Sequence, residues 1–249
     1  TIDDRIRNDA FKDGEVQLTE NKLEEAEKNE NTVLWSIGIG SRLNNYFGAG
    51  DGQINTITID EKLNGDGAKY LSLLEDTSQY ELYSVSPDGY IKGQEETKKT
   101  KINTTEKDPD ATIQVKRKTG TTDEGTITIN FIDKENAEKY SFLKLEFKAP
   151  IDFKAWEKFS KDNDVAEVPS NYQFLNDATI LYDDDNDNKH QVHGETNLAA
   201  KGIYGQKTAK DVTNNRIQWQ AILNASSMDI GQPVITDTLS GDHIHGLAP

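Results

Sequence analysis

The stretch INTITIDEKLNGD, residues 54–66, decides the fold class of this chain. From Ile57 onward its apolar residues alternate with polar ones, which is the period of a half-buried β-strand. Glu61 shares the inward face of this strand with Ile59 and Leu63. A carboxylate among aliphatic side chains is unfavourable unless it is neutral or paired. Glu61 is therefore either a hydrogen-bonded structural acid or an acid that is kept protonated for chemistry.

The same period of two recurs along most of the chain. Polar turn clusters separate the alternating stretches, which lie at residues 33–39, 113–115, 127–131, 143–147, 174–180 and 217–223. Helical spacing is found at Asp152–Lys161, where aromatic residues recur every three positions, and a short helical turn is expected near Lys69–Leu74. Many short strands with one or two short helices predict an all-β fold, a two-sheet β-sandwich.

An internal repeat sets the domain organisation. NTVLWSIGIGS (31–41), which precedes the opening stretch, returns as NRIQWQAILNAS (215–226), and the opening stretch itself returns as GQPVITDTLSGD (231–242). The two copies are about 180 residues apart, which is one domain length. In the second copy the inward position of Glu61 is taken by Asp237.

Three segments follow from this repeat. Residues 16–202 are predicted to form a complete sandwich domain, and residues 203–249 the beginning of a second, incomplete copy. The polar residues 1–15 are predicted to be a linker or the tail of a preceding domain.

Composition excludes several function classes. The net charge of −16 argues against nucleic acid or an anionic membrane as a partner, because both would repel the chain. The absence of Cys excludes disulfides, Cys-ligated zinc and thiol catalysis. No apolar run approaches the ~18 residues that span a bilayer.

The ordered pattern of a Lys, about a dozen residues, a strand with Trp and then I-T-x-[DE]-x-L-x-G resembles a known family. It is similar to the isopeptide-bonded, immunoglobulin-like domains of the collagen-adhesin type in Gram-positive cell-wall adhesins. The stretch FLNDATI (174–180) resembles the late strand that carries the family's Asn. The resemblance implies an amide cross-link between Lys22 and Asn176, with Glu61 as the proton shuttle. It also implies that Lys207 and Asp237 hold the Lys and acid positions of the second copy.

The chemistry of such a cross-link needs no cofactor. A Lys amine is nucleophilic only when neutral, and burial lowers its pKa. Burial raises the pKa of a carboxyl group, so that the acid can donate a proton near neutral pH. Folding itself supplies the effective concentration of the reacting groups.

The resemblance implies a non-enzymatic, extracellular, cell-wall-anchored adhesin. Its partner would be a host extracellular-matrix protein of the collagen or fibrinogen kind, or a glycan. A pilin or stalk module with a structural role is the alternative. An acidic carbohydrate-active enzyme would need a second inward acid beside Glu61, and the sequence places none.

Three groups of polar residues remain. Asp183, Asp185 and Asp187 begin like a calcium loop, but the Gly and the final Glu of that loop are missing, so a hairpin turn is predicted. The His pairs 190/193 and 243/245 lack a nearby acid of suitable geometry, and no metal site is predicted. The basic residues at 98–101 and 116–118 either contact an anionic ligand or protect edge strands from aggregation.

Overall fold

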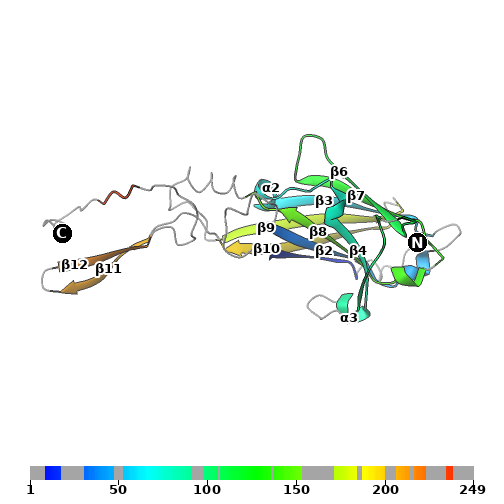
Figure 1. Ribbon diagram of the computed structural model, residues 1–249, viewed down its shortest axis with the longest axis horizontal. Helices are drawn as coiled ribbons and strands as arrows, with labels where there is room; N and C mark the ends of the chain where they lie inside the picture. The colour runs from blue at the N-terminus through cyan, green and yellow to red at the C-terminus, as the bar shows by residue number, and fades with distance from the viewer. Residues whose placement is uncertain are drawn as a thin grey trace. The chain divides into compact units, whose positions relative to one another are not determined.

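Figure 1 shows the computed structural model of the chain. The structure describes residues 9–17, 31–47, 53–90, 98–105, 107–135, 137–152, 171–183, 187–199, 206–213, 216–222 and 234–237. The chain divides into two compact units, residues 1–200 (unit 1) and residues 201–249 (unit 2). The division lies two residues before the boundary expected from the repeat.

Unit 1 is a sandwich of two five-stranded sheets, in which all neighbouring strands pair antiparallel. The first sheet has the order β1-β2-β8-β4-β5, with β1 Phe11–Gln17, β2 Thr32–Gly40, β8 Leu143–Pro150, β4 Tyr80–Val85 and β5 Lys99–Lys101. The second sheet has the order β10-β9-β3-β7-β6, with β10 Lys189–Ala199, β9 Asn171–Tyr182, β3 Thr56–Gly65, β7 Glu124–Phe131 and β6 Ala111–Arg117.

The predicted alternation decides which side chains fill the space between the sheets. Trp35 and Ile37 of β2 are fully buried, and so are Ile57 and Ile59 of β3. Phe147 of β8 stacks on Tyr80 of β4 with ring centroids 5.1 Å apart, which adds aromatic packing to the aliphatic core. The all-β sandwich that the period of two predicts is therefore confirmed.

Helical structure is limited to short connections in the described residues. They contain the α-helical turns α2 Gly67–Tyr70 and α3 Pro87–Tyr90 and the 3-10 turns η2 Leu43–Tyr46, η3 Thr77–Gln79 and η4 Ala137–Tyr140. The turn expected near Lys69–Leu74 is found partly: α2 begins two residues earlier and ends at Tyr70, and residues 71–74 are not helical. The helix expected at Asp152–Lys161 lies, apart from its first residue, outside the described residues. No helix among those described is long and apolar enough to cross a membrane.

The N-terminal strand β1 closes one side of the sandwich. It pairs with β2 in the first sheet and also lies against β10, the edge strand of the second sheet. The prediction of a linker at residues 1–15 is therefore wrong for residues 11–15. Hydrophobic periodicity misses β1 because Lys12 is its one buried residue.

The described part of unit 2 contains the antiparallel hairpin β11 Gln206–Thr213 and β12 Arg216–Ile222. Its register repeats that of β1 and β2. Lys207 pairs with Ala221, two residues after Trp219, just as Lys12 pairs with Ile37, two residues after Trp35. The two ladders therefore share their register from the Lys pair to the Trp pair, and this makes Lys12 the counterpart of Lys207. Beyond Ala209 a register shift in β11 separates the two.

Candidate functional site

Glu61 occupies the inward position that strand alternation predicts. It lies on β3, which runs between β9 and β7, and it is 3% exposed. Its direct neighbours across the ladders are Ala178 on β9 and Gly125 on β7. A long side chain from the opposite sheet reaches the carboxyl group.

That side chain is Lys12 of β1. Its Nζ donates to Oε2 of Glu61 at 2.5 Å, and both side chains are fully buried. The ammonium position lies 5.9 Å from the ring centroid of Trp35 and 5.7 Å from that of Phe147. Aromatic rings thus flank the Lys–Glu pair on the side of the first sheet and exclude water from it.

Burial sets the protonation of this pair. Desolvation lowers the pKa of Lys12, and the neighbouring Glu61 opposes this shift only in part. Desolvation also raises the pKa of Glu61, against the opposing effect of Lys12. Both shifts favour a neutral amine beside a neutral carboxylic acid, which are the forms that act as nucleophile and as proton donor.

Asn176 completes the cluster from β9. It is fully buried and pairs with Leu63 on β3 and with Gly194 on β10. The stem of Lys12 packs over Gly194, so it lies beside the Gly194–Asn176 pair.

The Asn176 amide lies close enough to Glu61 to lower the pKa of its carboxyl group. No group in the described part of the chain, however, forms a well-aligned hydrogen bond with its Oδ1 or Nδ2. A buried amide in this state is costly. It is also open to attack by an amine.

The structure therefore brings Glu61 and Asn176 together with Lys12, whereas Lys22 lies outside the described residues. Sequence reasoning passed over Lys12 because it counted residues back from Trp35. The connection between β1 and β2 spans residues 18–31, whereas only residues 214 and 215 connect β11 and β12. Pairing register would have found Lys12, but a count of residues through two unequal connections could not.

The second copy does not reproduce the acid position in the described residues. Residues 234–237 are exposed and form no strand, and Ile235 is 65% exposed. The inward position expected for Asp237 is thus not observed. In unit 1 the equivalent strand β3 is buried by its ladder partners β7 and β9, and the described part of unit 2 contains a single hairpin.

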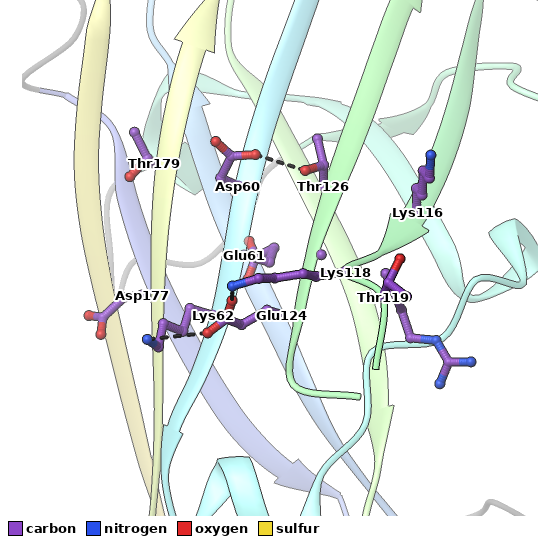
Figure 2. Close-up of a pocket in the computed structure, with 12 residues that line it drawn as sticks. Asp60, Glu61, Lys62, Lys116, Lys118, Thr119, Glu124, Thr126, Asp177 and Thr179 are labelled. Carbon is purple, nitrogen blue, oxygen red and sulfur yellow. Dashed lines mark hydrogen bonds and ion pairs between the residues drawn. The ribbon is translucent and has the colours of Figure 1, made fainter. Parts of the chain in front are cut away.

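The outer face of the second sheet carries a shallow depression of about 710 Å³ (Figure 2). Charged side chains and threonine hydroxyls line it. Lys62 and Lys118 both pair with Glu124, and the Thr126 hydroxyl donates to Asp60 at 2.8 Å. Glu124 thus links two of the lysines of this surface, whereas Arg117 and Asp177 pair with Glu75 and His193 beside it.

The other charged groups have structural roles. Lys99 and Lys101 on the edge strand β5 pair with Glu146 and Glu81, which fits the edge-protection interpretation of the basic residues. The predicted hairpin turn between β9 and β10 is confirmed by the pairing of the two strands. At its start Asp183 accepts from the backbone N–H groups of residues 55 and 56.

No protein-family model and no curated protein matches the chain. Among solved structures, the chain is similar to the collagen-binding subdomain of the Enterococcus faecalis surface protein ACE, with a TM-score of 0.35 and 10% sequence identity. The match covers 75% of this chain and 96% of that one.

Proposed function

We propose that unit 1 is a self-cross-linking β-sandwich, in which the Nζ of Lys12 forms an amide bond with the Cγ of Asn176 and Glu61 transfers the protons. The observation that carries this proposal is the buried Lys12–Glu61 pair beside a buried amide that has no aligned partner. The proposal assigns the nucleophile to Lys12, where the sequence pattern favoured Lys22.

The reaction exchanges one nitrogen for another at the amide carbon. The neutral amine of Lys12 attacks Cγ of Asn176 while the carboxylic acid of Glu61 donates a hydrogen bond to Oδ1. Glu61 then takes a proton from the attacking nitrogen and passes one to Nδ2, which leaves as ammonia. The products are a secondary amide, free ammonia and Glu61 in its starting protonation state, so no cofactor or oxidant is consumed.

Intact mass of the purified chain tests this proposal. Each cross-link releases one molecule of ammonia, so a linked chain is lighter than its sequence mass by about 17 Da. Lys12→Ala, Asn176→Ala and Glu61→Ala chains should each have the full mass of their own sequence. Lys22→Ala is the matched control and should retain the loss. A wild-type chain at its unmodified mass would refute the cross-link. If Lys22→Ala had its full mass while Lys12→Ala still lost ammonia, Lys22 would be the nucleophile instead.

Such a domain suits a bacterial surface protein that must resist force and proteolysis without disulfides. The bond would join β1, the first strand, to β9, one of the last two strands of unit 1. Tension applied to the chain would then bypass most of the sandwich. This supports the stalk or pilin module as one form of the proposal.

The adhesin form of the proposal adds a ligand, either a host extracellular-matrix protein or a glycan. The surface available for it is the depression on the outer face of the second sheet, which offers hydroxyl and paired charged groups to a polar ligand. A panel of collagen, fibrinogen and other matrix proteins together with a glycan array tests this form. Binding that is lost on Lys116→Glu, in the lining of the depression, supports the adhesin form, whereas no binding to any member supports the stalk.

A further inference from the structure

We propose that Gly194 is a positioning residue for the cross-linking reaction. The absence of a side chain at this point of β10 allows the stem of Lys12 to lie against the strand and brings its amine to Glu61 and Asn176. This inference rests on the proposed function and deepens it, because it names a residue that has no reacting group yet controls the rate.

Strand register places Gly194 at the centre of the site. It pairs directly with Asn176 across the β9–β10 ladder, so the two residues face the same side of the sheet. Asn176 is fully buried and faces the core. The neighbouring inward positions of β10 hold Val192 and Thr196, both of which carry branched side chains. Gly194 is thus the gap in the inward row of β10, and the gap lies opposite the electrophile.

The gap is filled by Lys12. A Cβ atom added at Gly194 would lie 2.9 Å from Cγ of Lys12 and 3.3 Å from both the carbonyl carbon of Lys12 and the backbone nitrogen of Asp13. Cγ is close to the root of the side chain, and β1 is held by its ladder with β2. A methyl group at Gly194 would therefore push the whole Lys12 stem, and part of the β1 backbone, away from β10.

Such a displacement matters more for the reaction than for the fold. A reacting nitrogen must lie within about 3–3.5 Å of the carbon that it attacks, and a misplacement of about 1 Å can slow a reaction roughly 100-fold. The expected effect of Gly194→Ala is a cross-linking rate that falls about 10- to 100-fold in chains that still fold.

The rate is measured by refolding chains recovered from denaturant before they have linked, and by following the loss of about 17 Da with time by intact mass. Gly40→Ala is the matched control. Gly40 is a strand glycine of β2 in the first sheet, and the atoms nearest to its added Cβ all belong to Leu43, with Cδ2 at 3.2 Å. Gly40→Ala should lower the melting temperature but link at the wild-type rate. Equal rates for Gly194→Ala and wild type would overturn this inference, whereas a wild type that never loses ammonia would overturn the proposed function instead.

Melting temperatures give a second test, which remains informative even if Gly194→Ala folds poorly. In an Asn176→Ala background no chain can link, so melting temperatures report packing alone. Gly194→Ala should lower the melting temperature there by several degrees while Lys12 is present, and by clearly less once Lys12→Ala has removed the Cγ atom in contact. The same loss in both backgrounds would show that Gly194 does not act through Lys12.

Discussion

Replacement of Asn176 by alanine is the sharpest test of what the cross-link contributes to stability. The change removes the electrophile but leaves the Lys12–Glu61 pair intact. The Asn176 amide forms no well-aligned hydrogen bond in the described residues, so its truncation removes only the interaction by which it lowers the pKa of the Glu61 carboxyl group. The variant therefore separates the covalent bond from the polar cluster around it.

The expected magnitude follows from the loop that the bond closes. Lys12 and Asn176 enclose most of unit 1, and the chain-entropy relation for a closed loop of this length gives roughly 5 kcal/mol. Truncation of the buried side chain adds about 1–2 kcal/mol through the small cavity that it leaves. For a domain of about 200 residues each kcal/mol shifts the melting temperature by about 2–4 °C, so a fall of roughly 12–28 °C is expected.

Calorimetry and intact mass on the same samples measure the contribution of the cross-link to the melting temperature. Asn176→Ala is measured in the wild-type chain and in a Lys12→Met chain, which cannot link in any case. The cavity contributes to both comparisons, and the bond contributes only to the first, so their difference isolates the bond. The reasoning fails if wild type has lost ammonia and yet the two melting-temperature changes are equal.

Three further outcomes are expected. In the Lys12→Met chain burial still raises the pKa of Glu61 above its ordinary value of 4.5. The folded state then holds a proton that the unfolded state releases, so stability falls as the pH rises above about 4.5 and through the folded-state pKa. Urea midpoints between pH 4 and 8 should show this slope, and it should vanish in the double variant that adds Glu61→Gln. Replacing Lys99 and Lys101 by valine should produce aggregation visible by light scattering, because β5 is an exposed edge, whereas Thr100→Val on the same strand keeps both charges and should remain monodisperse. The 249-residue chain should lose one ammonia and not two, and a second loss in the intact mass would show that unit 2 also links.

Much of unit 1 could be predicted from local pattern. Strand alternation correctly predicts the all-β sandwich and the burial of Glu61 and Asn176, because a period of two fixes the face on which each side chain lies. The repeat anchored on Trp35 and Trp219 reappears as two strand pairs that share their register from the Lys pair to the Trp pair. These features are local to one strand or one hairpin, and local patterns specify them.

The proposed nucleophile, Lys12, could not be predicted in the same way. On β1 a period-two search finds no apolar face, because Lys12 is the buried residue of the strand and Gly14 stands where Trp35 covers the backbone. The strand is held by its ladder with β2 and by its contact with β10, both of which are tertiary. The role of Gly194 is invisible for the same reason, since it depends on which side chain from the other sheet enters the gap.

The energetics of the cluster favour chemistry over stability as its purpose. A fully buried Lys–Glu pair loses more in desolvation than its mutual attraction returns in many proteins, and a well-packed apolar pair is often as stable or better. At Lys12 and Glu61 this disadvantage is joined by that of the Asn176 amide, so three costly groups lie together in an otherwise apolar core. Amide formation would remove the disadvantage of two of them at once, because the amine loses its basicity and the released ammonia carries away the unsatisfied nitrogen. Glu61 would then stay protonated and donate to the new amide oxygen. A purely structural acid would need only a hydrogen-bond donor beside it, and the arrangement supplies a nucleophile and an electrophile as well.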